Sequence, residues 1–254
     1  MIGHFLHGRG PVRAVVLHGW FGDWRVFSPM LPALDPERFT YAFLDYRGYG
    51  LSKAETGPFD VSTIAADACA LADHLGWERF AVVGHSMGGK AALRLAADAP
   101  ERVERVLALA PVWAGPAPFD PDTLDLFRGA PGDIAVREAI IHNTTDGRLP
   151  GAWSGEMARQ SAQASTQEAF AAYFESWALD DFANEVQGLP HETLVVVGAH
   201  DRGVPADLVR ATWLANLPNA SLSLFAEAGH YPMLEAPPRL AAVFDAFLSG
   251  AGKG

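Results

Sequence analysis

The chain has 254 residues with a formal net charge of −11 at pH 7, and 49% of its residues are hydrophobic. The negative charge argues against nucleic acid or an anionic membrane as a partner, and the apolar content excludes an intrinsically disordered chain. A single cysteine, Cys69, excludes an internal disulfide framework. No apolar run has the length of a signal peptide or a membrane span, so we expect a cytoplasmic protein.

Short apolar runs bounded by glycine, proline or polar residues predict seven strands along the chain. These runs are 3–7, 13–17, 40–44, 80–83, 103–109, 193–197 and 221–225. Segments with apolar residues at helical spacing lie between most of them, such as the one between Asp60, a typical N-cap, and Gly76. Strands that alternate with helices predict an α/β fold with a doubly wound, mostly parallel sheet.

Residues 112–188 have a different composition. Proline and glycine cluster at 115–121 and 129–132, large aromatic residues are scattered through helix-like segments, and no strand-like run is present. Predicted strands lie on both sides of this segment. The sequence therefore predicts a helical excursion that leaves the sheet after the strand 103–109 and returns before the strand 193–197.

The pattern Gly-x-Ser-x-Gly, centred on Ser86, follows the predicted strand 80–83 and precedes a helical segment. A serine on so sharp a strand-to-helix turn is held in a strained backbone conformation with its hydroxyl exposed, and nearby glycines let the neighbouring backbone approach. The first amides of the helix, beginning with Met87, point toward any oxygen beside Ser86.

Reactive side chains of a doubly wound sheet gather at the carboxyl ends of its strands. In this chain, four predicted strand ends carry such candidates: the loop at Trp20, Ser86, Asp201 and His230. A serine hydroxyl needs a base to take its proton, and the base needs a third group to orient it and stabilise its cation. His230 and Asp201 can fill these roles.

The sequence resembles the α/β-hydrolase superfamily over nearly its whole length. The motifs that carry the resemblance are His18-Gly19-Trp20-Phe21, Asp45-Tyr46-Arg47-Gly48-Tyr49-Gly50-Leu51-Ser52, Gly84-His85-Ser86-Met87-Gly88-Gly89, Gly198-Ala199-His200-Asp201 and Gly229-His230. The resemblance implies an α/β-hydrolase core over 1–111 and 189–254 and a helical cap over 112–188. It also implies an oxyanion hole formed by the main-chain amides of Trp20 and Met87.

The chain departs from the family pattern in two places. Few residues precede the strand 13–17, so the usual antiparallel pair at the N-terminus is reduced to one strand. The strand 103–109 is followed by Ala110-Pro111, where some relatives keep their acid. Asp201 is therefore the only acid that a motif places well.

These observations predict a serine hydrolase that cleaves a small, apolar carboxylic ester, with Ser86 as nucleophile, His230 as base and Asp201 as orienting acid. Trp20, Phe21 and Trp113 are expected to line the substrate pocket. The chemistry requires no metal and no organic cofactor. The expected partner is a small-molecule ester, without nucleic acid or membrane, and the chain is expected to be a monomer or a homodimer.

Several alternatives stay open. A lactone hydrolase or a carbon–carbon bond hydrolase would use the same three residues, and a small-ligand binding protein or a plain scaffold could share the fold. Epoxide and haloalkane hydrolysis are disfavoured, because they need a carboxylate at the position of Ser86. A structural role is expected for His18, for His85 and for Asp45 with Arg47, and His4 with His7 lacks the partners of a metal site.

Overall fold

The computed structural model describes residues 2–250 and contains a sheet of seven strands in the order β1-β3-β2-β4-β5-β6-β7. The strands are β1 (His4–Gly8), β2 (Val12–Leu17), β3 (Phe39–Leu44), β4 (Phe80–His85), β5 (Val103–Leu109), β6 (Glu192–Gly198) and β7 (Ala220–Phe225). All neighbours pair in parallel except β1, which pairs antiparallel with β3 at the edge. The predicted mostly parallel sheet and its single antiparallel edge strand are confirmed.

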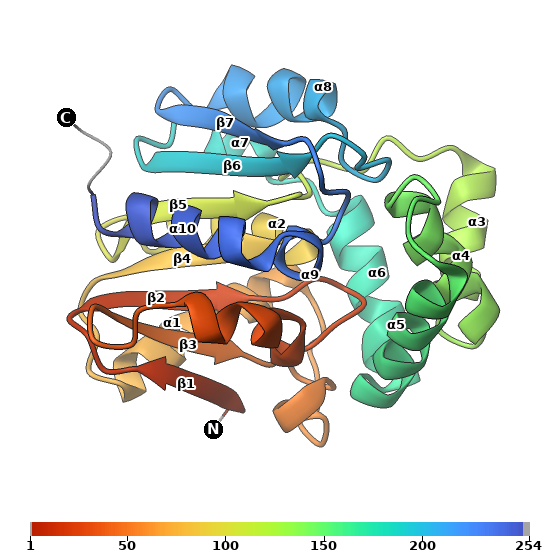
Figure 1. Cartoon of the computed structure of the whole chain (residues 1–254), viewed down its shortest axis with the longest axis horizontal. Helices are drawn as coiled ribbons and strands as arrows, with labels where there is room; N and C mark the ends of the chain where they lie inside the picture. The colour runs from red at the N-terminus through yellow and green to blue at the C-terminus, as the bar shows by residue number, and fades with distance from the viewer. Residues whose placement is uncertain (1, 251–254) are drawn as a thin grey trace.

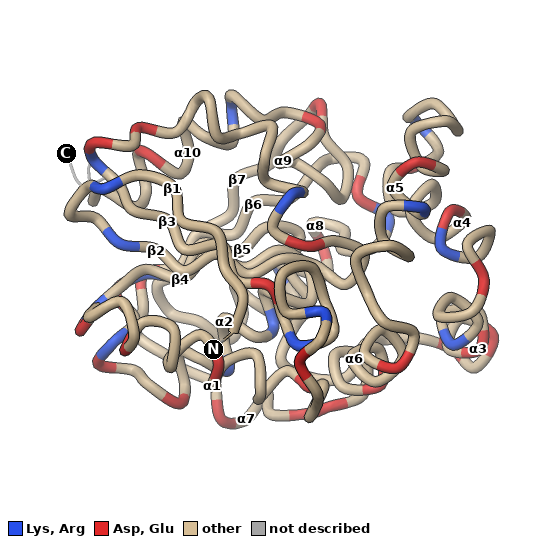
Figure 2. The backbone as a smooth tube through the Cα atoms, turned by 90° about the horizontal axis from the view of Figure 1, so that it is seen from below, with Lys and Arg blue, Asp and Glu red and all other residues tan. Residues whose placement is uncertain are grey.

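The central strands are apolar on both faces because helices cover the sheet on both sides. Figure 2 shows α1 (Val61–His74), α2 (Met87–Asp98) and α7 (Ala183–Val186) on one side, and α9 (Pro232–Glu235) and α10 (Pro237–Leu248) on the other. The 3₁₀ segment η1 (Trp24–Ala33) packs with α10 and α9. A short helix α8 (Ala206–Val209) and a π turn η3 (Arg210–Leu214) connect β6 to β7.

The predicted helical excursion is confirmed. Between β5 and β6 the chain forms α3 (Pro121–Gly129), α4 (Ile134–Thr144), α5 (Gly151–Ala164), α6 (Gln167–Leu179) and α7. Figure 1 shows α3 to α6 beyond the arrowheads of the central strands, which places them at the carboxyl end of the sheet. We call residues 112–188 the helical insertion. Its separation as a cap from a core of 1–111 and 189–254 stays a prediction, and residues 1 and 251–254 lie outside the described residues.

One strand boundary differs from the sequence-based expectation. β4 does not stop before Gly84 but continues through His85, because Gly84 and His85 pair with Ala108 and Leu109 of β5. Helix α2 begins at Met87, as expected, so the reversal between strand and helix takes place at Ser86 alone. Within residues 2–250, no helix is both long enough and apolar enough to cross a membrane.

Gly84→Ala is expected to lower the free energy of unfolding. A Cβ at Gly84 would lie 2.2 Å from the carbonyl oxygen of Gly88, so β4 and α2 would have to move apart. Overpacking of this kind costs about 1–3 kcal/mol, which for a chain of this size is a loss of roughly 2–12 °C in melting temperature. Gly151→Ala is the control, because its Cβ would meet nothing within 4 Å. Equal thermal melting of the two variants would contradict the prediction.

Candidate active site

Ser86 has a strained backbone, with φ 54° and ψ −115°, between the last residue of β4 and the first of α2. Three main-chain hydrogen bonds hold it there. Its N–H donates to the carbonyl of Leu109 at 2.9 Å, and its own carbonyl accepts from Gly89 at 2.9 Å and Val112 at 3.0 Å. A non-glycine residue held at positive φ by its surroundings is typical of functional sites.

The structure brings Ser86, His230 and Asp201 together from three different strand ends. His230 Nε2 lies 3.1 Å from Ser86 Oγ, and His230 Nδ1 lies 2.9 Å from Asp201 Oδ2. The other carboxylate oxygen of Asp201 accepts the main-chain N–H groups of Gly203 at 2.8 Å and Val204 at 2.9 Å. Since a carboxylate only accepts, Nδ1 is the protonated nitrogen, which leaves Nε2 free to accept the Ser86 proton.

Glu235, on α9, holds the loop of His230, and sequence analysis missed it. Its two carboxylate oxygens accept the N–H groups of Gly229 at 2.9 Å and Tyr231 at 3.0 Å, the residues on either side of His230. Its side chain is buried and forms an ion pair with Arg148 of the helical insertion. The glutamate five residues after the histidine was the available signal, but nothing in the sequence shows which N–H groups it accepts.

The loop after β2 approaches Ser86 closely. A Cβ at Gly19 would lie 3.3 Å from the Cβ of Ser86 and 2.6 Å from the His85 ring. A small space of about 10 Å³ lies between this loop and Ser86 and is bordered by Gly19, Trp20 and His230. It is about large enough for one water molecule. Among residues 2–250, no acceptor is found for the main-chain N–H of Trp20 or of Met87.

Trp20 is fixed from both ends. Its indole Nε1 donates to the carbonyl of Phe170 at 2.7 Å, and its own carbonyl accepts the hydroxyl of Tyr49 at 2.9 Å. Its ring stacks on the ring of Phe170, with centroids 4.0 Å apart. Phe170 lies on α6 of the helical insertion, so the insertion directly orients a residue that borders the space at Ser86.

A cavity of about 570 Å³ opens from Ser86 and His230 into the helical insertion. Its walls are mainly apolar, with a few polar groups from α3, α4 and the loop after β6. The lining residues are Trp20, Phe21, Ser86, Val112, Phe119, Thr123, Leu126, Phe127, Ala139, Ile140, Asn143, Thr144, Trp177, Arg202, Gly203, Val204, His230 and Tyr231. A mainly apolar cavity with a few polar groups is typical of a small-molecule site.

Two of the predicted pocket residues, Trp20 and Phe21, line this cavity, but Trp113 does not. Trp113 lines a neighbouring cavity of about 380 Å³ and packs edge-on against Trp213, with centroids 5.9 Å apart. Trp113 is close in sequence to the end of β5, but the chain turns away from Ser86 after Val112, so this closeness did not predict its position correctly. Eight of the eighteen lining residues come from α3, α4 and α6, whose orientation no local pattern specifies.

The remaining histidines of the site are buried and have structural contacts. His18 stacks on Tyr46 with centroids 3.8 Å apart and donates from Nδ1 to the Gly19 carbonyl at 2.8 Å. Burial lowers the pKa of His18 to about 4, although the Gly19 hydrogen bond and the charge of Asp23 raise it. His85 donates from Nε2 to the carbonyl of His230 at 2.9 Å, and burial lowers its pKa well below the ordinary value.

Asp45 and Arg47 brace the loop after β3. The Asp45 carboxylate accepts the N–H groups of Trp24 at 2.7 Å and Leu51 at 2.8 Å, and burial raises its pKa to about 7 against these two hydrogen bonds. Arg47 forms two hydrogen bonds with Asp67, at 2.8 and 2.9 Å. Neither residue lines the cavity at Ser86. Within residues 2–250, no three His, Cys, Asp or Glu side chains are grouped as a metal site would need.

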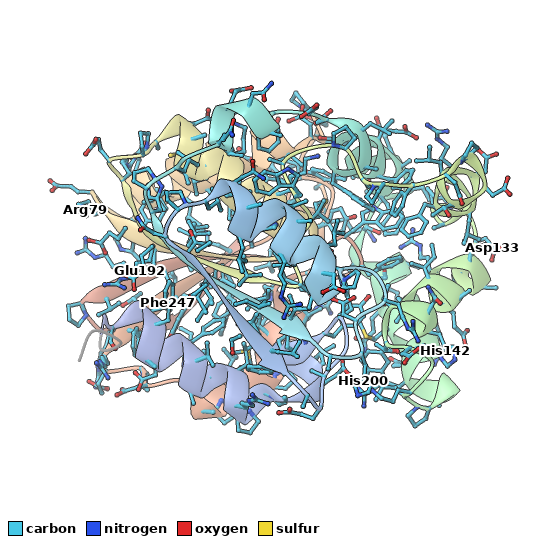
Figure 3. The ribbon with its side chains drawn as sticks, turned by 90° about the horizontal axis from the view of Figure 1, so that it is seen from above. Arg79, Asp133, His142, Glu192, His200 and Phe247 are labelled. Carbon is cyan, nitrogen blue, oxygen red and sulfur yellow. The ribbon has the colours of Figure 1, made fainter. Side chains whose placement is uncertain are left out.

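Side chains labelled in Figure 3 show which end of the sheet carries the site. His200, which precedes Asp201, lies on the side of the helical insertion, where Asp133 and His142 are also found. Arg79, Glu192 and Phe247 lie at the opposite end. The candidate site is therefore enclosed between the carboxyl ends of the strands and the insertion.

Comparisons with known proteins agree with this arrangement. The model of a family described as "alpha/beta hydrolase fold" matches residues 15–237. A 2-hydroxymuconate semialdehyde hydrolase of Pseudomonas putida is 32% identical over 220 residues, which are 82% of this chain and 76% of the relative. A protein of Caulobacter sp. strain K31 named "Putative carbamate hydrolase RutD" is 30% identical over 260 residues, 97% of this chain and 95% of that protein.

Among solved structures, an esterase from Exiguobacterium antarcticum superimposes with a TM-score of 0.87. The match covers 98% of this chain and 95% of the esterase, at 20% sequence identity. At this identity the likeness establishes the shared fold alone.

Proposed function

The chain belongs to the α/β-hydrolase family, and from that premise we propose that it is a serine hydrolase that cleaves a small, apolar carboxylic ester through an acyl-enzyme on Ser86. The observation that carries this proposal is the unbroken contact from Ser86 Oγ to His230 Nε2 at 3.1 Å and from His230 Nδ1 to Asp201 Oδ2 at 2.9 Å. This is the geometry that a serine nucleophile needs for activation by a base.

In the first half-reaction, Ser86 Oγ attacks the ester carbonyl and its proton moves to His230 Nε2. The Asp201 carboxylate stabilises the imidazolium through Nδ1–H. The negative oxygen of the tetrahedral intermediate accepts the main-chain N–H groups of Trp20 and Met87, which have no other acceptor among residues 2–250. One such donor is worth about 10²- to 10³-fold in turnover. His230 then gives its proton to the departing alkoxide, which leaves as the alcohol.

In the second half-reaction, water attacks the acyl-enzyme while His230 Nε2 takes one of its protons. A second tetrahedral intermediate forms with its negative oxygen on the same two N–H groups and collapses, and the proton on Nε2 returns to Ser86 Oγ as the carboxylic acid is released. The enzyme returns to its starting state, with neutral His230 hydrogen-bonded to the Asp201 carboxylate. No step requires a metal or an organic cofactor.

The apolar walls of the cavity favour a substrate whose acyl or aryl group is apolar. This group would extend from Ser86 toward the helical insertion. Phe119, Phe127, Ile140 and Trp177 form much of the wall. Each methylene of the acyl chain that leaves water there contributes about 0.8 kcal/mol, or roughly a factor of four in kcat/KM. We propose that p-nitrophenyl esters become better substrates as the acyl group lengthens from acetate until the cavity is filled.

The test is a kinetic screen of p-nitrophenyl esters from acetate to decanoate, run beside lactones. The expected result is a burst of p-nitrophenol equal to the enzyme concentration, followed by steady turnover that rises with acyl length. Stoichiometric binding of the ester without any burst would instead favour a small-ligand binding protein. Preferential turnover of the lactones would show that the substrate is a lactone and not an open-chain ester.

Carbon–carbon bond hydrolysis is a second candidate, and the relative named as a 2-hydroxymuconate semialdehyde hydrolase supports it. The same three side chains would serve this reaction. It predicts that kcat/KM for a vinylogous diketone exceeds that for every ester in the screen. The opposite ranking would leave ester hydrolysis as the preferred reaction.

A further inference from the structure

Lys90 is a buried cation on the first turn of α2, four residues after Ser86. Its side chain is fully buried, and its Nζ donates to the main-chain carbonyls of Gly115 at 3.1 Å, Trp177 at 3.0 Å and Asp180 at 2.6 Å. An ammonium group has three N–H donors, so these three acceptors satisfy all of them. Burial lowers the pKa of Lys90 to about 8, and the charges of Asp180 and Asp181 raise it.

The three acceptors come from both connections between the helical insertion and the sheet. Gly115 lies on the outgoing connection, between β5 and α3, whereas Trp177 and Asp180 lie at the end of α6 on the returning one. The two connections also bond to each other, from Ala117 N to the Ala178 carbonyl at 2.8 Å and from Phe182 N to the Ala114 carbonyl at 3.1 Å. One side chain of the nucleophile's helix therefore ties both ends of the insertion.

Trp177 links this attachment to the substrate cavity. The same residue whose carbonyl accepts from Lys90 contributes to the wall of the cavity at Ser86 and to the neighbouring cavity. Its indole also packs edge-on against Trp20, with centroids 5.6 Å apart. A shift of the Trp177 backbone would therefore change the width of the cavity next to Trp20.

We propose that Lys90 is a positioning residue that fixes the helical insertion relative to Ser86 and so sets the fit of the acyl group in the cavity. This inference rests on the proposed ester hydrolysis. An acetyl group stays beside Ser86 and does not reach the insertion, whereas a long acyl group extends along the walls that Trp177 helps to form. The contribution of Lys90 to catalysis therefore depends on acyl length.

The main test is Lys90→Met, which keeps the length of the side chain and removes all three donors. For p-nitrophenyl decanoate we expect kcat/KM to fall about tenfold or more, mainly through KM, and for p-nitrophenyl acetate to stay within about threefold. The rate at which a small fluorophosphonate labels Ser86 should also stay within about threefold. A residue that only adds stability would lower the melting temperature and leave the decanoate-to-acetate ratio unchanged.

Lys53→Met is the matched control. Lys53 also donates to a carbonyl of the insertion, that of Gln163 at 2.5 Å, but on the surface and away from α2. Its decanoate-to-acetate ratio should equal that of the wild type. Should Lys90→Met fail to fold, Lys90→Gln keeps two N–H donors, and a smaller loss confined to decanoate is expected from it.

An unchanged ratio in the folded Lys90 variant, or equal losses for both esters, would overturn the role of Lys90. Failure of the proposed function has a different signature. In that case the wild-type protein itself gives no burst with either ester and no fluorophosphonate label on Ser86.

Discussion

Ser86→Ala is expected to lower kcat for p-nitrophenyl esters by roughly 10⁴- to 10⁶-fold while the fold is retained. The substitution removes the nucleophile, so no acyl-enzyme can form and the burst of p-nitrophenol disappears. Turnover above the rate in water, through the N–H groups of Trp20 and Met87 and through binding, would remain. The measurement is steady-state and burst kinetics on the purified variant, with thermal melting to show that it is folded.

Ser52→Ala is the control for this experiment. Ser52 is buried in the loop that follows β3. Its hydroxyl accepts the N–H of Gly3 at 2.6 Å and does not line the cavity. Its loss should affect stability and leave the burst intact. Normal turnover in Ser86→Ala would refute the assignment of the nucleophile.

Asp201→Asn is expected to lower kcat by about 10⁴-fold, the second largest effect. The amide oxygen of the new side chain can still accept the N–H groups of Gly203 and Val204, so its NH₂ group faces His230 Nδ1. Nδ1 must then accept, which moves the imidazole proton to Nε2. In that tautomer His230 donates toward Ser86 and cannot take its proton.

The measurement for Asp201→Asn is kcat with an ester that the wild type cleaves well, together with the melting temperature. Asp207→Asn is the control, since Asp207 lies six residues along the chain with its side chain 96% exposed. It should behave as the wild type. A loss of less than about tenfold in Asp201→Asn would show that Asp201 does not set the tautomer of His230.

The sheet could be predicted from the sequence because each strand is a short apolar run closed by glycine, proline or polar residues. The sharp strand-to-helix turn at Ser86 could be predicted from the spacing of its glycines. The positions of Asp201 and His230 at strand ends could be predicted from the order of the strands along the chain. Parallel strands bring their carboxyl ends to one edge, so residues far apart in the sequence meet there without any further information.

The walls of the cavity and the supports of the site could not be predicted in the same way. Trp113 is a large aromatic residue close to a strand end, yet it packs against Trp213 and not beside Ser86. Lys90 reads as an ordinary polar residue of a helix, and its three carbonyl partners lie 25 to 90 positions away. Such contacts depend on how the helices of the insertion pack, which no local pattern records.

Glu235 is a further support of the site. It lies on the short helix α9, which begins at Pro232. The sequence does not show that its carboxylate turns back to the N–H groups on both sides of His230. The loop of the proposed base is thus held by a residue that sequence analysis had no reason to place in the site.

The most direct test of the account is covalent labelling by a fluorophosphonate, followed by mass spectrometry of the digested protein. The account predicts one phosphonyl group per chain on the peptide that contains Ser86, none in Ser86→Ala, and labelling slowed by about 10³-fold or more in His230→Gln. A wild-type protein that stays unlabelled, or one labelled on another residue at the same rate with and without His230, would contradict it.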